Sequence, residues 1–434
     1  MEERAVRRIQ VPGDKSVTQR ALIFASLASG ESRLRGLLPG EDPQATAGAL
    51  RALGVDIPPF GEDGGEVRIQ GVGLRGLQAP SDVLDLENSG TGARLMLGVL
   101  AGQAMTVTVT GDASLRSRPM RRVTAPLSKM GAIFREMGEP DRLPLELTGG
   151  SLVSLDYDSP VASAQVKSAL LLAGLVGGVS VVLSEPHRSR DHTERMLGMC
   201  GVGVDSHQEG DVWRIELRDP PERIAPLDLE VPGDFSSATF LLALAILGGV
   251  EGGLEIDRVG MNPTRRGLLQ VLGRMGANVG ADPFEEEDGK EPLSSLRGLP
   301  SKLVGTNVGA DEVPGMIDEF PVLAILAARA EGVTRITGAG ELRLKESDRI
   351  QVLAENLRAV GVRAEELSDG LEIEGGDHPL TGRVSSHHDH RIAMAFGVLG
   401  ALPGNHIEID GADVADVSFP GFEGLLEDLT AART

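Results

Sequence analysis

The stretch VPGDKSVTQRALIFASLASG, residues 11–30, returns as VPGDFSSATFLLALAILGGV at residues 231–250. Each copy shows the end of a strand, a Pro-Gly-Asp turn, and a serine near the start of an apolar helix. The two copies are 220 residues apart (231 − 11), about half of the 434-residue chain. A repeat of that length predicts two similar lobes.

A shorter pattern divides each half into smaller units. Five segments end a helical pattern with glycine and then start a strand. Their glycines are Gly54, Gly131, Gly201, Gly276 and Gly361. A sixth helix is expected in PGFEGLLEDLTAA (420–432), and the opening strand AVRRIQV (5–11) would complete its unit. The sequence therefore predicts an α/β fold of two lobes with three units each.

The lobe boundaries follow from a chain that closes on itself. We expect residues 14–225 to form one lobe, and residues 1–13 with 226–434 to form the other. The two chain crossings, near residues 13 and 226, would make a two-stranded hinge, and a ligand site between the lobes is the first expectation. The alternative is an ordinary two-domain α/β protein with degenerate Gly-rich turns.

Composition excludes several classes of protein. The formal net charge of -22 argues against a general nucleic-acid or anionic-membrane surface. No apolar run is long and unbroken enough to span a bilayer, and the N-terminus lacks the apolar core of a signal peptide. The single cysteine, Cys200, excludes an internal disulfide and fits a reducing compartment. We therefore expect a soluble, cytoplasmic protein.

The first copy of the long repeat contains a candidate anion site. Lys15 and Ser16 lie at its strand-to-helix turn, and Arg20 follows about one helical turn later. Exposed amides at a helix start, beside two cations, suit an anion. The segment is not a Walker A loop, because Asp14 stands where that pattern needs glycine. A plain capped helix with solvated charges is the alternative.

Other motifs place small, polar or basic residues ahead of apolar helices. The small residues of NSGTGAR (88–94) let the backbone approach a ligand closely. The four arginines of SLRSRPMRR (114–122) suit a carboxylate or phosphate. The segments SAQVK (163–167) and SRDHTE (189–194) add Ser163, Gln165, Lys167, Arg190 and His192.

In LRLKESDRIQ (342–351), Lys345 and Arg349 stand one helical turn apart, where like charges repel. An anion between them would explain the arrangement. Cations occur in the motifs of both halves, and they could converge in one cleft. They are Lys15, Arg20, Arg118, Lys167, Arg190, Lys345, Arg349 and Arg391. Such a cluster would bind small molecules with several negative charges.

Two further groups could carry chemistry. Asp318 and Glu319 border an apolar stretch, where carboxylates act as caps or, with raised pKa values, in proton transfer. His387, His388 and His390 suggest a metal, but a single cysteine and the lack of companion spacing argue against one. An anion contact by His390 and Arg391 fits better.

Together these motifs resemble the 5-enolpyruvylshikimate-3-phosphate (EPSP) synthase family of enolpyruvyl transferases. GDKSVTQR, NSGTGARL, SAQVK, SRDHTE, NPTR, KESDR and DHRIAM occur in the family's order, over nearly the whole chain. SAQVK, RDHTE and NPTR look like the class II branch, which is often insensitive to glyphosate. The resemblance implies an inverse α/β barrel in each of two lobes that close on substrates.

The implied reaction moves the enolpyruvyl group of phosphoenolpyruvate onto the 5-hydroxyl of shikimate 3-phosphate and releases phosphate. It is an addition followed by an elimination, with no metal or organic cofactor. By resemblance, Asp318 is the base toward the hydroxyl and Glu346 exchanges a proton at the methylene carbon. Lys15 assists proton transfer.

The resemblance also implies the binding residues. Those for phosphoenolpyruvate are Lys15, Asn88, Gly90, Arg118, Gln165, Arg349 and Arg391. Those for shikimate 3-phosphate are Lys15, Ser16, Arg20, Ser163, Ala164, Gln165, Arg190, Asp318 and Lys345. The family expectation is a monomer.

Three positions depart from common family patterns. Glu341 replaces an asparagine that is common in the class I branch. Val417 stands where many members carry lysine, so that basic contact is not carried over. Gly90 lies where glyphosate-tolerant members often have alanine, whose methyl group crowds the inhibitor. We therefore expect glyphosate to inhibit this chain better than its class II motifs suggest.

Two rival functions remain open. A UDP-N-acetylglucosamine enolpyruvyl transferase has a similar fold and reaction, but usually carries a reactive residue in a mobile loop, whereas Cys200 lies at a helix-strand junction. A non-catalytic binding protein for a phosphorylated metabolite would explain the cations but leave Asp318 and Glu346 without a role.

Overall fold

The computed structural model describes residues 6–61, 64–283 and 289–431. They form two compact units. The N-terminal unit comprises Gly13–Val231 and Glu287–Glu291, and the C-terminal unit comprises Met1–Pro12, Pro232–Glu286 and Pro292–Thr434. The chain thus changes units inside both copies of the VPGD repeat, after Pro12 and after Val231.

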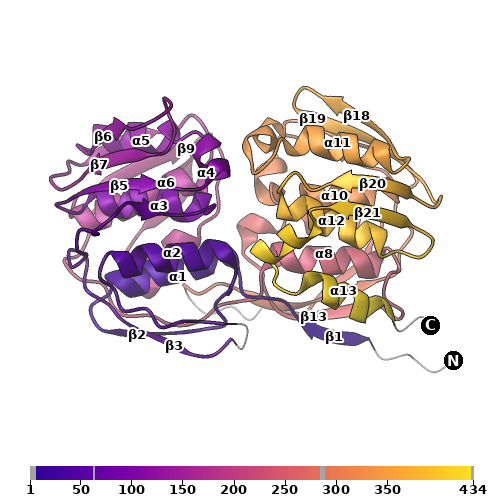
Figure 1. The fold of residues 1–434 in the computed structure, drawn as a ribbon, viewed down its shortest axis with the longest axis horizontal. Helices are drawn as coiled ribbons and strands as arrows, with labels where there is room; N and C mark the ends of the chain where they lie inside the picture. Colours follow the sequence, from indigo (N-terminus) through magenta and orange to yellow (C-terminus); the bar gives the residue numbers. More distant parts are fainter. Residues whose placement is uncertain (1–5, 62–63, 284–288, 432–434) are drawn as a thin grey trace. The chain divides into compact units, whose positions relative to one another are not determined.

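The N-terminal unit alternates helices and strands along the chain (Figure 1). Its strands are β2 (Glu31–Arg35), β3 (Val67–Gln70), β4 (Leu84–Asp85), β5 (Thr106–Thr110), β6 (Ile133–Glu136), β7 (Leu145–Thr148), β8 (Leu155–Asp158), β9 (Val181–Glu185), β10 (Asp205–Glu209), β11 (Val212–Leu217) and β12 (Asp228–Glu230). Its helices are α1 (Lys15–Leu27), α2 (Glu41–Ala52), α3 (Gly90–Ala101), α4 (Ala113–Ser117), α5 (Arg121–Lys129), α6 (Ala164–Gly177) and α7 (His192–Met199).

The C-terminal unit has the same alternation. Its strands are β1 (Arg7–Gln10), β13 (Leu254–Gly260), β14 (Asn278–Ala281), β15 (Leu293–Leu299), β16 (Asn307–Val308), β17 (Gly332–Ile336), β18 (Arg363–Leu367), β19 (Gly370–Gly375), β20 (Thr381–Ser385) and β21 (His406–Asp410). Its helices are α8 (Phe235–Ile246), α9 (Gly267–Arg274), α10 (Phe320–Ala328), α11 (Arg349–Ala359), α12 (His390–Gly400) and α13 (Phe422–Thr430), with 3₁₀ helices η1 (Pro263–Arg265), η2 (Val313–Met316), η3 (Gly340–Leu344) and η4 (Ala412–Val417).

One sheet pattern recurs through both units. Every sheet contains one parallel pair, and these pairs are β12–β2, β4–β5, β8–β9, β1–β13, β16–β17 and β20–β21. In five of the six sheets that the described residues form, an antiparallel strand follows the pair, as β15 follows β13. Three such sheets belong to each unit, so the mixed α/β class and the threefold repeat are confirmed.

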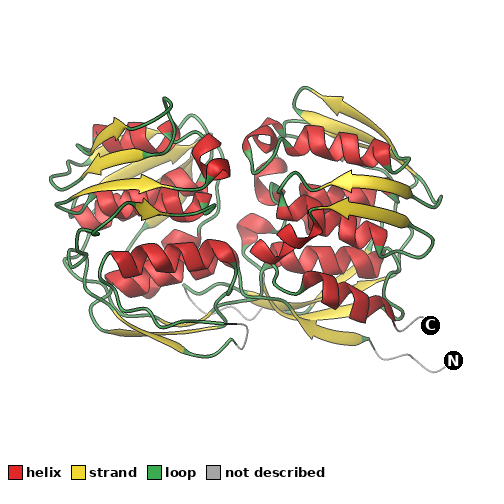
Figure 2. Cartoon of the chain, in the orientation of Figure 1, coloured by secondary structure: helices red, strands yellow, loops and turns green. Residues whose placement is uncertain are grey.

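Each unit encloses apolar helices behind its sheets. All residues of α8 and α10 are buried, as are nearly all of those of α3 and α12. A helix that is hydrophobic on every side is stable only when neighbours surround it. Figure 1 accordingly shows α8, α10 and α12 packed side by side, with α11 and α13 outside them. Figure 2 shows that strands cover the outer faces.

The five helix-ending glycines all adopt the left-handed backbone, with φ between 81° and 112°. This confirms their prediction as C-caps, because only glycine reaches that region without strain. Strands begin within a few residues of four of them, but the described residues between Gly54 and β3, 55–61 and 64–66, are irregular. Pro58 and Pro59 lie in that segment and cannot donate to a sheet.

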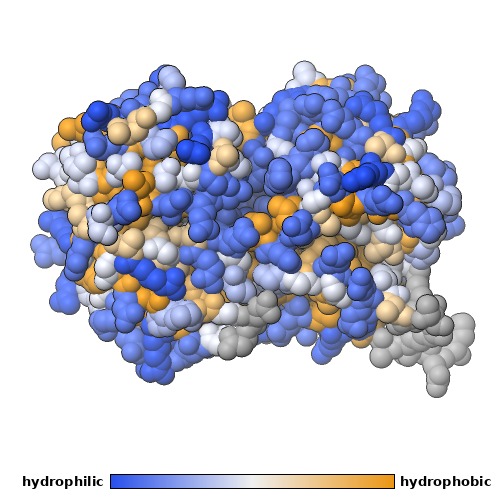
Figure 3. All heavy atoms as spheres, in the orientation of Figure 1, coloured by the Kyte–Doolittle hydropathy of each residue, from blue (hydrophilic) through white to orange (hydrophobic). Residues whose placement is uncertain are grey.

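Surface polarity is consistent with the acidic composition. The face drawn in Figure 3 is mostly hydrophilic on both units, with apolar residues scattered among the polar ones. Within the described ranges, none of the helices has the length and apolar character that a bilayer crossing requires.

Candidate active site

The predicted site residues fall into two groups, one in each unit. The N-terminal unit holds Lys15, Ser16, Arg20, Asn88, Gly90, Arg118, Ser163, Ala164, Gln165 and Arg190. The C-terminal unit holds Asp318, Lys345, Glu346, Arg349 and Arg391.

The first turns of three helices meet in the N-terminal unit. Each helix begins after a polar cap: Asp14 for α1, Ser89 for α3 and Ser163 for α6. Gln19 Nε2 donates to Ser89 Oγ at 2.6 Å, which joins α1 to α3. Gln165 Nε2 donates to Thr91 Oγ1 at 3.0 Å, which joins α6 to α3. Three helix N-termini in one place create a region of positive potential.

Arg20 is the most deeply placed cation of this group, with 3% of its surface exposed. Its guanidinium donates to Thr193 Oγ1 (2.8 Å), Ser168 Oγ (2.9 Å) and the Ser16 carbonyl (3.0 Å), so the hydrogen-bond partners that the described residues give it are neutral. Burial lowers the pKa of Arg20 to about 10, and the charge of Arg190 acts in the same direction. A buried guanidinium with neutral hydrogen-bond partners, near a second cation, suits a bound anion.

A second group of contacts surrounds Gly90 at the start of α3. Arg118 donates to Asn88 Oδ1 at 2.5 Å and to Ser114 Oγ at 3.1 Å. Arg94 donates to Gln165 Oε1 at 3.0 Å. A Cβ atom added at Gly90 would lie 2.8 Å from Arg118 Nη1, so the missing side chain leaves room for this guanidinium. Arg94 is thus part of the site, although the sequence analysis named it only within its motif.

Lys15, the first residue of α1, lies 2.9 Å from Asp42 Oδ2. Both side chains are largely but not fully buried. The ammonium therefore already has a carboxylate partner, which an incoming anion would have to share or replace.

Arg349 is the centre of the C-terminal group. Its side chain is 1% exposed and donates to Asp389 at 2.8 Å and 3.2 Å, and to Glu346 Oε2 at 2.7 Å. Asp318 Oδ1 lies 3.5 Å from its Nη1. Burial acts to lower the pKa of Arg349, but the three carboxylates, Asp389 foremost, raise it above its usual value. This guanidinium stays charged.

The predicted helical spacing of Lys345 and Arg349 is wrong. Lys345 follows the 3₁₀ helix η3, and α11 begins only at Arg349, after its cap Asp348. The polar pair Ser347 and Asp348 favours a helix cap at Asp348 over one helix that runs from Lys345 through Arg349. Three carboxylates already neutralise Arg349, so its position needs no anion to explain it. Burial lowers the pKa of Lys345, and the charge of Arg349 acts in the same direction. The charges of Asp318 and Glu346 act in the opposite direction but do not cancel this effect.

Asp318 lies between two arginines. Arg349 approaches its Oδ1, and Arg391 Nη2 lies 3.8 Å from its Oδ2. Arg391 also donates to the Asp318 carbonyl at 3.2 Å. Its neighbour Glu319 is fully buried and accepts from Ser236, to which Arg265 also donates. The two adjacent carboxylates thus differ: Asp318 is partly exposed among cations, and Glu319 is internal.

The sequence analysis missed Asp389, which is fully buried and anchors Arg349. The sequence feature that could have indicated Asp389 is its position directly before α12. Its side chain caps that helix and accepts from the Arg391 amide at 3.0 Å. An aspartate directly before an apolar helix is a typical cap.

The expectation that Lys167 joins the cation group is wrong. Its side chain is 0% exposed and lies between Glu185 and Glu194. The three histidines also differ in position. His387 and His388 occupy a left-handed turn, and His390 begins α12. Among the described residues no group of His, Cys, Asp or Glu is arranged to hold a metal ion.

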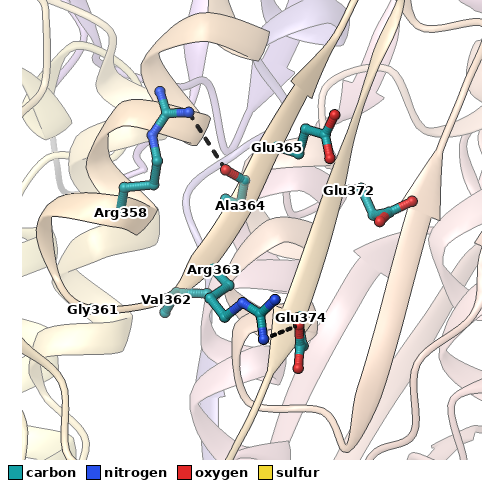
Figure 4. A pocket seen from close by; sticks show the side chains of 8 residues that line it. All are labelled: Arg358, Gly361, Val362, Arg363, Ala364, Glu365, Glu372 and Glu374. Carbon is teal, nitrogen blue, oxygen red and sulfur yellow. Dashed lines mark hydrogen bonds and ion pairs between the residues drawn. The ribbon is translucent and has the colours of Figure 1, made fainter.

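An open depression of about 440 Å³ lies in the C-terminal unit, beside the end of α11 and strands β18 and β19 (Figure 4). Charged side chains line it, among them Arg358 and Glu365, and Arg363 pairs with Glu374 at 2.9 Å. None of its lining residues belongs to the predicted site, so this depression is not the candidate active site.

Comparison with known proteins adds an independent result. A family model described as EPSP synthase (3-phosphoshikimate 1-carboxyvinyltransferase) matches residues 2–426. A protein of that enzyme name from Alkalilimnicola ehrlichii is 49% identical over 429 residues, covering 98% of this chain and 94% of the relative. Another, from Gloeobacter violaceus, is 48% identical over 417 residues, covering 95% of this chain and 94% of the relative.

Solved structures agree. EPSP synthase from Acinetobacter baumannii superposes with a TM-score of 0.83 at 42% identity, covering 97% of this chain and 94% of that chain. The enolpyruvyl transferase NikO from Streptomyces tendae has a TM-score of 0.71 at 18% identity, covering 98% and 94%, which shows a shared fold alone.

Proposed function

The chain belongs to the EPSP synthase family, and from this premise we propose which of its residues carry the family's reaction. The enzyme transfers the enolpyruvyl group of phosphoenolpyruvate to the 5-hydroxyl of shikimate 3-phosphate and releases phosphate. This is a step of the shikimate pathway toward chorismate and the aromatic amino acids. The chemistry needs one group that accepts the hydroxyl proton and another that protonates the methylene carbon.

Asp318 is the proposed base toward the 5-hydroxyl, and Glu346 the group that gives and takes the methylene proton. One observation carries this assignment: both carboxylates are partly exposed and lie on the same buried guanidinium, that of Arg349. A fixed cation between them keeps the two proton-transfer groups in place and leaves each of them able to transfer a proton. A protein that only bound anions would have no need of them.

The N-terminal unit is proposed to hold most of shikimate 3-phosphate. Arg20 and Arg190 supply the charge, and the helix starts supply amides and hydroxyls. The remaining proposed contacts are Lys15, Ser16, Ser163, Ala164, Gln165, Asp318 and Lys345.

Phosphoenolpyruvate carries a carboxylate and a phosphate, so it needs several cations. The proposed set is Lys15, Asn88, Gly90, Arg118, Gln165, Arg349 and Arg391. Lys15 would also assist proton transfer. The lowered pKa of Lys345 supports a role near the reacting hydroxyl, because a lysine of reduced basicity exchanges a proton more readily.

The deciding experiment measures phosphate release from phosphoenolpyruvate in EDTA. One reaction contains shikimate 3-phosphate and a parallel reaction contains UDP-N-acetylglucosamine. Release only with shikimate 3-phosphate is the expected result. Release with the sugar nucleotide instead would overturn the substrate assignment.

The catalytic roles have their own test. Asp318→Asn and Glu346→Gln should lower kcat by about a hundred-fold or more, because each removes a proton-transfer group. Binding of shikimate 3-phosphate, followed by calorimetry, should persist in Glu346→Gln. Near-parental kcat in both variants would show that the two carboxylates are not the acid and base.

Glyphosate is a further proposed ligand, in competition with phosphoenolpyruvate, and the absence of a methyl group at Gly90 supports this. We also propose a monomeric enzyme of the cytoplasm. An inhibition constant for glyphosate far above the KM for phosphoenolpyruvate would contradict the first proposal. Elution of the purified chain at twice its mass of 45.6 kDa would contradict the second.

A further inference from the structure

Lys167 is a charged residue placed where charge is costly. It lies on α6 with its side chain fully buried. Its ammonium is 2.8 Å from Glu194 Oε1 and 3.4 Å from Glu185 Oε1, and it donates to the Ser189 carbonyl at 3.2 Å. Removing three charged groups from water is expensive, and hydrophobic replacements often do no worse for stability. Stability alone therefore explains this group poorly.

The contacts of the group converge on one residue of a loop. Glu185, the last residue of β9, accepts from the Ser189 amide at 2.7 Å and from its hydroxyl at 2.8 Å. Lys167 binds the carbonyl of the same residue. All three polar groups of Ser189 are thus fixed by two buried side chains. The backbone that enters the next residue, Arg190, has little freedom left.

The other side of Arg190 is fixed as well. Asp191 accepts from Arg188 at 2.7 Å and from Arg195 at 3.1 Å, and α7 begins directly after it. Glu194, on the first turn of α7, forms an ion pair with Lys167. One lysine therefore ties α6, the end of β9, the loop of Arg190 and α7 together.

The position of Arg190 matters because its charge acts on a second cation, Arg20. Its charge contributes to the lowered pKa of Arg20, so the two guanidiniums are close enough to repel. Arg190 is half-buried, so its guanidinium lies partly within the protein beside this loop. A shared anion needs both guanidiniums at a fixed spacing.

We propose that Glu185 and Lys167 are positioning residues for shikimate 3-phosphate, acting through Ser189 to hold Arg190 beside Arg20. The proposal rests on the proposed function, since it names how that substrate's site is set. It also gives the motifs SAQVK and SRDHTE a common physical basis in this chain. The lysine of the first motif and the glutamate of the second are partners in one buried group.

The test substitutes Glu185, since Lys167→Met would leave two buried carboxylates without a cation and could prevent folding. Glu185→Leu removes both acceptors of Ser189 but leaves Lys167 paired with Glu194. Glu185→Gln keeps an acceptor for the Ser189 amide and is the conservative rescue. Glu216→Leu is the matched control: Glu216 is a buried carboxylate of β11, in the same sheet, and its ion pairs among the described residues are with Arg214 and Arg218.

Initial rates give the KM for each substrate and kcat. Glu185→Leu should raise the KM for shikimate 3-phosphate by about ten-fold, with kcat changed about three-fold or less. Glu185→Gln should recover most of this loss. Glu216→Leu should leave the KM within about two-fold of the parent, whatever it does to the unfolding midpoint.

A double-substitution cycle tests the route through Arg190. In an Arg190→Ala background, Glu185→Leu should add less than about a two-fold rise in KM, because the residue that it positions is gone. An equal rise in both backgrounds would overturn the proposal, as would a Glu185→Leu protein that is less stable but has parental KM. If Glu185→Leu does not fold, Ser189→Ala replaces it, with an expected rise of about three-fold.

The two proposals fail differently. A parent enzyme that releases no phosphate with shikimate 3-phosphate refutes the proposed function. A parent that turns over normally, with variants that keep its KM, refutes only the positioning role.

Discussion

Asp389 offers the sharpest test of how the C-terminal group is held together. Its carboxylate is fully buried, accepts twice from Arg349, and also accepts from Ser347 Oγ at 3.1 Å and the Arg391 amide at 3.0 Å. Asp389→Asn preserves the size of the side chain and its ability to cap α12. The substitution removes the negative charge and turns one of the two acceptor oxygens into an amide donor.

The magnitude follows from the geometry. Two unit charges 2.8 Å apart, at an effective dielectric constant near 20, attract with about 6 kcal/mol. This is an upper bound, because Glu346 and Asp318 remain beside the guanidinium. Removing one partner of a buried ion pair typically costs about 3–5 kcal/mol. The remaining carboxylates reduce that figure, so we expect the free energy of unfolding to fall by about 2–4 kcal/mol.

Urea unfolding, followed by circular dichroism, measures this loss by linear extrapolation. The two units can unfold in separate steps, so the transition that shifts in the variant is the one to compare. The matched control is Asp377→Asn. Asp377 pairs with Arg329 at 2.7 Å but its side chain is 100% exposed, so the same substitution should cost about 0.5 kcal/mol or less. Equal losses in the two variants would refute the reasoning, since burial would then have no effect.

The remaining predictions concern three single positions. Gly90→Ala places a methyl group against Arg118 and should raise the KM for phosphoenolpyruvate about ten-fold, and the glyphosate inhibition constant further; unchanged initial-rate constants would contradict this. Burial raises the pKa of Cys200 to about 12, so the folded state disfavours the thiolate. The parent should therefore lose about 1.5–2 kcal/mol relative to Cys200→Ala between pH 8 and 10, a decline that parallel urea titrations would either show or exclude. Gly361→Ala should destabilise by about 1–2 kcal/mol because φ is 95° with open space around it. Gly273→Ala, in α9 with equally open space, should not lower the thermal midpoint; equal midpoints for both would be contrary to expectation.

Local signals predicted much of the fold. The VPGD repeat, the helix-ending glycines and the wholly apolar helices each act through the backbone or through neighbours within a few residues. The irregular segment after Gly54 was within reach too, because Pro58 and Pro59 disqualify a strand. Its prediction failed because the repeat was given more weight than the prolines.

The site was harder, since its partners come from distant segments. Lys167 stands in a motif rich in polar residues, and nothing in its neighbourhood shows that Glu185 and Glu194 will enclose it. Arg349 likewise meets Asp389, 40 residues further along the chain. A sequence shows that charges are present; only the fold shows which of them already neutralise one another.

The exchange of strands between the two halves of the chain has a consequence during synthesis. Strand β1 leaves the ribosome first, but its partner in the sheet is β13, and the pairing Arg7–Leu254 spans 247 residues (254 − 7). At about 5–20 residues per second, β1 waits roughly 12–50 s before it can pair. Strand β12 comes just after the other helices and strands of the N-terminal unit and completes its first sheet at once. The nascent chain therefore finishes the helices and strands of one unit while it carries a strand of the other that is still unpaired.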